Sequence, residues 1–246
     1  AKELLPINGK PGLEYILDEC IEAGIKEVIF IISKKKMMIK KYFYNDKFYK
    51  DIIKKKGDPK IIKEYKKILK YKKMIKFVFQ DKPLGTGDAV YKTKKFITDK
   101  YFLMLLPDDL IIKKNCSKSM ILVHKKFKAS VMASMKVNKS DVTRWGIYNI
   151  KKKIDKNNFI INNVVEKPSI KTSPSNYAVI GRYILPKTIF SKLKSLKPGK
   201  SGEFHITDAI QALIEDDHQF IGHNFSGKYL DCGTMNGYIK STLEIS

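Results

Sequence analysis

Residues 11–32, PGLEYILDECIEAGIKEVIFII, decide the fold class. The first half carries apolar residues at three- and four-residue spacing, which predicts a helix that begins at Pro11 and stops at Gly24. The second half contains VIFII at 28–32, a short and mostly β-branched run that is typical of a strand buried on both faces of a parallel sheet. A helix followed directly by such a strand indicates an α/β protein.

The alternation of helix and strand continues through most of the chain. The pattern predicts two or three Lys-rich helices over 34–73, a strand at 75–79, a Gly-containing loop at 80–87, a helix near 88–97, a strand at 101–106, a helix at 117–127 and a strand at 130–135. Strands then dominate, at 145–150, 159–165 and 177–185, before helices return at 187–195, 207–216 and 234–243. We expect a central mixed, mostly parallel sheet flanked by helices, in a single domain of residues 1–246.

Composition excludes several classes of protein. The chain has 246 residues, of which 43% are hydrophobic and 11% aromatic, too many for intrinsic disorder. No apolar run approaches the roughly 20 residues that span a bilayer, so no membrane protein is expected. Three widely spaced cysteines and four scattered histidines give neither a disulfide framework nor a zinc motif. We expect reduced thiols and a cytoplasmic location.

The formal net charge of +24 suggests a polyanionic partner, but its distribution weakens that reading. Residues 34–76 hold 18 Lys against four acidic residues, while Arg occurs only at Arg144 and Arg182. Proteins that read nucleic-acid sequence favour the bidentate Arg side chain. We interpret the Lys excess as compositional drift on a solvated surface and expect no nucleic-acid partner, with polyanion binding as the alternative.

Four short motifs lie where an α/β sheet places its ligands, beyond the carboxyl ends of strands. The loop at 80–89 brings Gly85 and Gly87 to the start of a helix, where backbone can approach a ligand closely. Leu106-Pro107-Asp108-Asp109 places carboxylates after a buried strand, a position suited to Mg²⁺. Glu166-Lys167-Pro168 and Asp231-Cys232-Gly233 also follow strands. Each motif alone is equally consistent with a turn, a helix cap or a surface ion pair.

The order of the motifs is more specific than any one of them. The chain resembles the bacterial UTP–glucose-1-phosphate uridylyltransferases from Lys2 to about Leu243, in the segments Lys2-Glu3-Leu4-Leu5-Pro6, Gln80 with Leu84-Gly85-Thr86-Gly87-Asp88-Ala89, Leu106-Pro107-Asp108, Trp145-Gly146, Val165-Glu166-Lys167-Pro168, Pro174-Ser175-Asn176 with Gly181-Arg182-Tyr183, Gly202-Glu203 with Thr207-Asp208-Ala209-Ile210, and Asp231-Cys232-Gly233. The helical insertion and the segment 174–183 favour this branch among sugar nucleotidyltransferases.

The resemblance implies a Rossmann-like nucleotidyltransferase fold. Within it we expect a Lys-rich helical insertion at about 34–74, a sugar-binding half at about 138–233 and a C-terminal helix at about 234–244. The resemblance further implies transfer of a uridylyl group from UTP to glucose 1-phosphate, which gives UDP-glucose and pyrophosphate, and a homo-oligomer.

The resemblance also implies the site residues and the metal. Asp108 and Asp231 would hold Mg²⁺, and Lys2 and Lys167 would be catalytic, Lys2 at the reacting phosphates and Lys167 at the sugar phosphate. The sugar would contact Gly146, Glu166 and Lys167. The nucleotide would contact Gln80, Gly85 and Thr86.

One departure from the family concerns the N-terminal end of the motif order. The family begins with a strand and a loop of the type Gly-x-Gly-Thr-Arg that wraps the nucleotide phosphates, and Lys2 matches the lysine of the motif that follows it. We therefore expect that 20 to 25 residues, about one strand and its loop, are absent ahead of Ala1. Two alternatives to the uridylyltransferase stay open: a thymidylyl-type enzyme, and a non-catalytic polyanion-binding protein.

Overall fold

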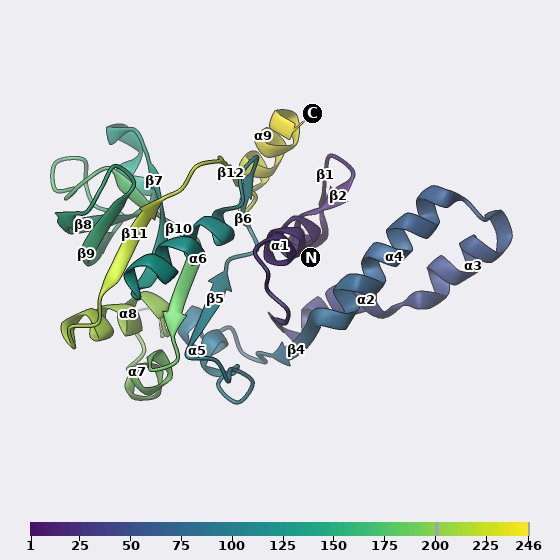
Figure 1. The fold of residues 1–246 in the computed structure, drawn as a ribbon, viewed down its shortest axis with the longest axis horizontal. Coiled ribbons are helices and arrows are strands. Elements are labelled where there is room, and N and C mark those ends of the chain that lie inside the picture. The colour runs from purple at the N-terminus through teal and green to yellow at the C-terminus, as the bar shows by residue number, and fades with distance from the viewer. Residues whose placement is uncertain (200–201, 246) are drawn as a thin grey trace.

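The structure is a computed structural model that describes residues 1–199 and 202–245 (Figure 1). The helices are α1 (Gly12–Glu22), α2 (Met37–Tyr44), α3 (Asp46–Lys56), α4 (Pro59–Met74), α5 (Thr86–Tyr91), α6 (Cys116–Phe127), α7 (Ile189–Ser195), α8 (Ile206–Glu215) and α9 (Met235–Ile245). The strands are β1 (Pro6–Ile7), β2 (Lys10–Pro11), β3 (Val28–Ile32), β4 (Ile75–Phe79), β5 (Tyr101–Leu105), β6 (Asp109–Ile112), β7 (Ser130–Lys136), β8 (Gly146–Lys153), β9 (Asn158–Glu166), β10 (Tyr177–Pro186), β11 (Phe220–Asn224) and β12 (Lys228–Asp231).

The helix and strand predicted over residues 11–32 are both present. α1 buries Leu13 and Leu17 along one side. Gly24 follows its end with a positive φ of 82°, which glycine adopts at little cost. β3 pairs in parallel with β4 over five residues. It is less buried than predicted, because Val28, Ile29 and Ile31 are only half-buried.

The main sheet has six strands in the order β5-β10-β7-β11-β9-β8. It is mixed, as predicted, but the prediction of a mostly parallel sheet is wrong. Within the described residues, only β7 with β11 and β3 with β4 pair in parallel. β10 lies antiparallel between β5 and β7, and β8 forms an antiparallel hairpin with β9. Antiparallel strands need only short connections, which suits the strand-rich second half of the chain.

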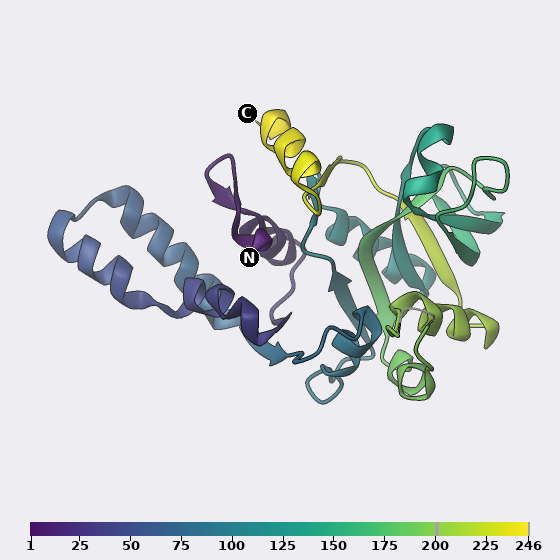
Figure 2. The ribbon, with the colours of Figure 1, turned by 180° about the vertical axis from the view of Figure 1, so that it is seen from behind.

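Helices cover both faces of this sheet (Figures 1 and 2). On one face α6 packs Met120 and Val123 against strand residues that include Val131 and Ile221. On the other face α5, α7 and α8 pack against alternate residues of the same strands, such as Met132 next to Val131. The alternation of side chains along each strand thus builds two cores from one sheet.

Two local features differ from the sequence prediction. β11, at the centre of the sheet, is not predicted because Gly222 interrupts its apolar run. A Cβ at residue 222 would lie 2.1 Å from the Phe159 ring, so the close packing of β9 excludes a side chain there. The helix predicted at 88–97 already ends at Tyr91, where the Thr93 hydroxyl donates to the carbonyl of Val90.

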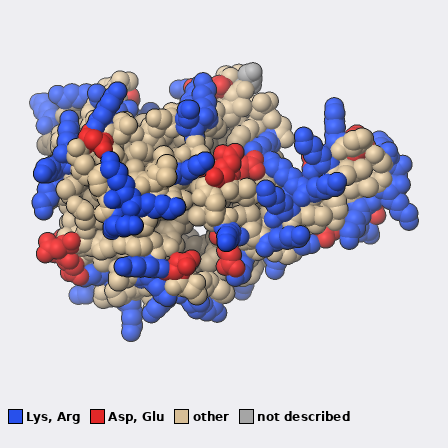
Figure 3. Space-filling model, viewed as in Figure 1, with Lys and Arg blue, Asp and Glu red and all other residues tan. Residues whose placement is uncertain are grey.

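The Lys-rich segment forms an arm of three helices, α2 to α4, that projects from the body of the molecule (Figures 1 and 2). Its inner end is anchored where the buried Tyr71 donates to Asp18 of α1 at 2.6 Å. Its outer end holds α3, of which no described residue is buried. Lysine side chains are spread over the visible surface of the arm and outnumber the acidic ones there (Figure 3). In the described part of the chain, no helix has the length and apolar character that crossing a membrane requires.

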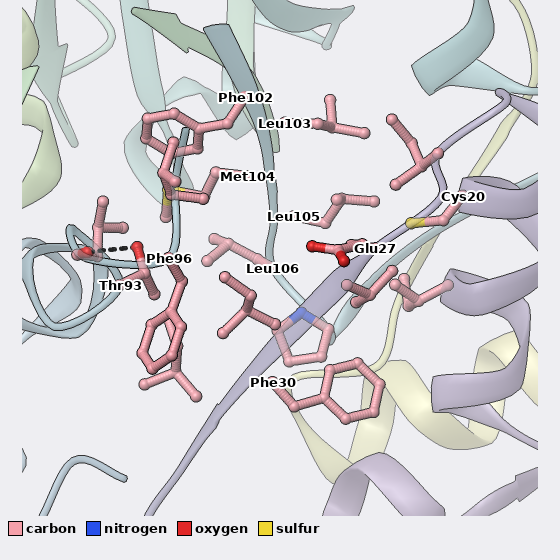
Figure 4. Close-up of a pocket in the computed structure, with 18 of the residues that line it drawn as sticks. Cys20, Glu27, Phe30, Thr93, Phe96, Phe102, Leu103, Met104, Leu105 and Leu106 are labelled. Carbon is pink, nitrogen blue, oxygen red and sulfur yellow. Dashed lines mark hydrogen bonds between the residues drawn. The ribbon is translucent and has the colours of Figure 1, made fainter. Parts of the chain in front are cut away.

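A slot separates the main sheet from the β3–β4 pair. It has a volume of about 980 Å³ and is lined on one side by β3 and on the other by β5. Most of its lining is apolar, including Phe30, Phe102 and Leu105 (Figure 4). Among the described strands, β3 pairs only with β4 and β5 only with β10, so each presents an unpaired edge.

Candidate active site

A small antiparallel sheet brings two distant acidic motifs together. β6 begins at Asp109 and pairs with β12, which ends at Asp231, with these two residues opposite each other. The backbone N–H of Cys232 donates to the carbonyl of Asp108 at 2.8 Å, and the N–H of Gly233 donates to Asp231 Oδ1 at 2.9 Å. The turn after β5 and the turn after β12 are therefore joined.

Gly233 leaves a space between the two carboxylates predicted to hold a metal. A Cβ at residue 233 would lie 3.1 Å from Asp108 Oδ2 and 3.2 Å from Asp231 Oδ1. The two oxygens are therefore no more than about 6.3 Å apart. Two oxygens that share one ion with ligand distances near 2.1 Å lie at most about 4.2 Å apart, which this bound allows. The juxtaposition predicted for Asp108 and Asp231 is confirmed.

Lys2 joins these carboxylates. Its Nζ lies 2.8 Å from Asp108 Oδ2 and 3.4 Å from the carbonyl oxygen of Gly233. Partial burial by itself lowers the pKa of the Lys2 ammonium, but the hydrogen bond and the charge of Asp108 outweigh it, so the pKa is raised. Lys2 is therefore cationic at neutral pH and lies beside the space between the carboxylates.

These two carboxylates fit a Mg²⁺ ion whose remaining ligands are substrate phosphates and water. Within the described ranges, no group of three or more His, Cys, Asp or Glu side chains forms a metal cage. Mg²⁺ in phosphate-transfer sites is usually bound through one or two carboxylates together with substrate phosphates and water. Asp108 and Asp231 supply that number of carboxylates.

A second cluster lies on the hairpin of β8 and β9. Gly146 begins β8 and is paired with Glu166 at the end of β9. A Cβ at residue 146 would lie 3.0 Å from Glu166 Oε2 and 3.1 Å from Val164 Cγ1, so the Glu166 carboxylate crosses over this glycine. Lys167 follows with a positive φ of 44°, and its N–H donates to the carbonyl of Trp145 at 3.0 Å. The predicted sugar-binding residues therefore form one group.

The Trp145 ring connects this group to the acidic turns. It packs edge-on against the ring of Tyr229 in β12, with ring centroids 5.5 Å apart. The Tyr229 hydroxyl donates to Asp109 Oδ1 at 2.6 Å, and the N–H of Gly181 donates to Asp109 Oδ2 at 2.8 Å. Burial raises the pKa of Asp109, although both hydrogen bonds oppose this. Asp109 thus supports the structure, whereas the neighbouring Asp108 faces Lys2.

The third cluster is the loop at 80–87. The Gln80 side-chain amide donates to the carbonyl of Gly85 at 3.1 Å and to Asp88 Oδ2 at 2.8 Å. Gly85 has a φ of 94°, and a Cβ there would lie 2.6 Å from the carbonyl oxygen of Phe204. The Thr86 hydroxyl accepts from the N–H of Ile206 at the start of α8. In this structure Phe204 approaches Gly85, and Gln80 and Thr86 brace the loop.

Sequence reasoning missed the contacts that hold the acidic turns. The sequence places Asp109 only among the carboxylates suited to Mg²⁺ and Arg182 only in a motif, and it assigns Glu19 and Tyr229 no role. All four residues are buried or mostly buried, and they make contacts with residues far away in the chain. No local sequence pattern reveals such contacts. The available signal was the rarity of Arg in a Lys-rich chain, since one of the two arginines lies in an apolar strand.

An α/β fold with strand-end carboxylates beside a lysine is typical of proteins that transfer phosphate-containing groups. The chain belongs to the nucleotidyl transferase family, whose sequence profile matches residues 1–246. It is 34% identical over 244 residues to UTP–glucose-1-phosphate uridylyltransferase 2 of Staphylococcus saprophyticus, covering 99% of this chain and 83% of the relative.

Solved structures show the same likeness. A UDP-glucose pyrophosphorylase complexed with UDP-glucose superimposes with a TM-score of 0.84 at 30% identity, covering 99% of this chain and 89% of the other. A UTP-bound enzyme of the same kind from Acinetobacter baumannii gives a TM-score of 0.89 at 28% identity, covering 99% of this chain and 85% of the other.

Proposed function

We propose that the protein transfers a uridylyl group from UTP to glucose 1-phosphate, giving UDP-glucose and pyrophosphate. The observation that carries this proposal is the convergence of Lys2, Asp108 and Asp231 at the ends of β5 and β12. The names of the relatives and structural neighbours support the same substrates.

The reaction needs no protein nucleophile. A phosphate oxygen of glucose 1-phosphate forms a bond to the α-phosphorus of UTP, while the bond from that phosphorus to the oxygen of the leaving pyrophosphate breaks. The attacking oxygen is already anionic near pH 7, so no base has to remove a proton. The task of the protein is to hold two polyanions in line and to offset their repulsion.

The charged residues of the site suit this task. Mg²⁺, held by Asp108 and Asp231, would neutralise charge on the phosphates. The Lys2 ammonium, placed by Asp108, contributes a further positive charge at the reacting phosphates. Lys167 binds the phosphate of the sugar substrate, next to the sugar-facing Glu166.

The remaining residues select the substrate. The Glu166 carboxylate accepts hydrogen bonds from sugar hydroxyls, and Gly146 leaves room for the ring beside it. On the nucleotide side, Gln80 and Gly85 lie at the loop that faces the base, with Thr86 fixing that loop to α8. Because thymine differs from uracil by one methyl group, discrimination at the base between UTP and dTTP is expected to be modest.

The test is a pyrophosphate-release assay with UTP, glucose 1-phosphate and Mg²⁺. Because the resemblance implies that members of the family begin with a strand and a Gly-rich loop, the assay uses residues 1–246 preceded by that segment of the Staphylococcus saprophyticus relative, here called the extended protein. Asp108→Asn and Asp231→Asn should each lower kcat/KM by about 10²- to 10³-fold, because each removes part of the charge stabilisation.

Asp217→Asn is the matched control. Asp217 has a positive φ of 59°, which Asn also tolerates, and it lies in a turn after α8. This variant should keep full activity. Pyrophosphate release from dTTP but not from UTP would favour the thymidylyl alternative, and release from neither would contradict the proposed function.

A further inference from the structure

Arg182 of β10 is fully buried and uses all of its N–H donors. Nε and Nη2 donate to the Glu19 carboxylate, with Nη2 to Oε2 at 2.9 Å. Nη1 donates to the carbonyl oxygens of Leu106 at 3.1 Å and Gly181 at 2.9 Å. Nη2 also donates to the carbonyl oxygen of Asp109 at 2.7 Å. The planar guanidinium can make these contacts at once because its donors diverge in a fixed geometry.

Two of these carbonyls bracket Asp108. Leu106 lies two residues before Asp108 and Asp109 directly after it, so Arg182 fixes the backbone on both sides of the carboxylate proposed to hold Mg²⁺. The N–H of Cys232 holds the carbonyl of Asp108 itself and joins it to the turn of Asp231. The turn thus has little freedom to move relative to Asp231.

Glu19 anchors Arg182 to two further helices. It lies near the end of α1, and its Oε1 also accepts from the N–H of Ser117 at 3.1 Å and from the Ser117 hydroxyl at 2.5 Å, at the start of α6. α1 follows the segment that carries Lys2. The pair therefore connects α1, α6, β10 and the Asp108 turn within one buried network.

We infer that Arg182 and Glu19 are positioning residues that set the distance between the Asp108 and Asp231 carboxylates. The inference rests on the proposed metal site. A purely structural ion pair would be replaceable by apolar residues of similar size without functional loss, since such replacement is often neutral or stabilising. A positioning pair is not replaceable in this way, because methyl groups cannot hold the carbonyls of Leu106 and Asp109.

The experiment uses the chain of residues 1–246 with Mn²⁺ and UDP-glucose, whose phosphates can complete the coordination of the metal, and the free ion is measured by electron paramagnetic resonance against UDP-glucose alone. Three variants are compared: Arg182→Lys, Arg182→Met, and the double variant Glu19→Met/Arg182→Met. Thermal unfolding is followed by circular dichroism for each. Tyr71→Phe is the matched control, because it removes the part-buried hydrogen bond by which the arm is anchored to Asp18 of α1.

Arg182→Lys should weaken Mn²⁺ binding by about 10- to 100-fold, the usual effect of removing a group that orients a metal ligand. Arg182→Met should unfold at a lower temperature, because it leaves Glu19 buried without its partner. The double variant should recover thermal stability but not Mn²⁺ affinity. Tyr71→Phe should lose stability and keep Mn²⁺ affinity.

The outcomes separate the two proposals. If the unsubstituted chain binds Mn²⁺ and the double variant binds it equally well, the positioning role is overturned and the metal site stands. If the unsubstituted chain fails to bind Mn²⁺ in the presence of UDP-glucose, the proposed metal site falls and the positioning role falls with it. Asp108→Asn serves as the reference for complete loss of the site.

Discussion

At Gly146 the absence of a side chain determines where the Glu166 carboxylate lies. Gly146→Ala would add a methyl group 3.0 Å from Glu166 Oε2 and 3.1 Å from Val164, closer than packed atoms tolerate without movement. We expect the variant to weaken UDP-glucose binding by about 10-fold, the scale of one misplaced methyl group in a binding pocket. Isothermal titration calorimetry of residues 1–246 with UDP-glucose measures this.

Gly199→Ala is the control for that substitution. The nearest atom to its added methyl group would be the carbonyl oxygen of Glu203 at 3.5 Å, an ordinary contact. UDP-glucose affinity should therefore stay unchanged. Equal affinities for both variants would show that Glu166 does not contact the sugar as proposed.

His223 predicts how stability depends on pH. Its ring nitrogens contact Asn158 Oδ1 at 2.8 Å and the Ser119 hydroxyl at 3.1 Å, and burial lowers its pKa below the ordinary value of 6.5. The unfolded chain thus binds a proton at higher pH than the folded chain, so stability falls as pH drops below 6.5 until the folded-state pKa is reached.

His223→Gln should flatten that decline. Gln does not titrate, and its amide can replace a contact of the ring. Thermal midpoints measured between pH 7.5 and 5 for both proteins provide the comparison. His218 also has a pKa lowered by burial and should account for part of the slope that the variant keeps. An unchanged slope in His223→Gln would exclude His223 as a contributor.

The residues of the site were predictable to different degrees. Lys2, Asp108 and Asp231 follow from the resemblance, and the structure brings them together. Arg182 and Glu19 did not follow, because their function depends on carbonyls more than 70 positions away in the chain. A buried ion pair leaves no local pattern in the sequence. A strand-end carboxylate can be recognised, because it directly follows an apolar run.

Among the elements, the arm of α2 to α4 can be tested for whether it takes part in substrate binding. α4 begins at Pro59 and is capped by Asp58, whose Oδ1 accepts from the N–H of Lys60 at 2.8 Å. Asp58→Ala removes this cap and should lower the free energy of unfolding by about 1 kcal/mol. UDP-glucose affinity should not change, because the cap lies on the arm away from the sugar half (Figure 1).

The control for the arm is Asp51→Ala, an exposed residue within α3 that caps no helix. Urea unfolding should give the same midpoint for this variant as for the unsubstituted chain, or a slightly higher one, since Ala favours helix. A change in UDP-glucose affinity in Asp58→Ala would contradict the separation of arm and site.

Helices and strands with a regular apolar spacing were predictable, and a strand whose apolar run is interrupted was not. α1, α4 and α6 have regular apolar spacing and recognisable ends, and they occur close to where the pattern puts them. β11 has a glycine and a histidine within five residues, and its place in the sheet depends on packing with Phe159 that only the fold creates. Strand direction likewise depends on partners that the sequence does not name.

For the whole molecule, the slot is the gap between the two parts of the sheet structure, the β3–β4 pair and the six-stranded sheet. Among the described strands, β3 and β5 present unpaired edges to it, and its apolar lining is that of a core. Glu3 lines the same slot, and its buried Oε2 has no hydrogen-bond partner among the described residues. Buried carboxylate oxygens are normally hydrogen-bonded. One added strand would pair both edges and join the β3–β4 pair to the main sheet.

The slot bears directly on the activity of residues 1–246. The strand that the resemblance implies would occupy it, and the Gly-x-Gly-Thr-Arg loop would then add backbone N–H donors and an Arg at the phosphates. Since loss of even one such donor typically costs about 10²- to 10³-fold in rate, residues 1–246 alone should form little UDP-glucose. The extended protein should be active and Mg²⁺-dependent, and its β3 and β5 amides should exchange hydrogen more slowly than those of residues 1–246.

A second extended protein, with the strand replaced by Gly and Ser but the loop kept, should stay inactive, because polar flexible residues cannot fill an apolar slot. Pyrophosphate release and hydrogen exchange are measured on all three proteins. Equal rates of pyrophosphate release from residues 1–246 and from the extended protein would show that neither the strand nor the loop is needed for activity.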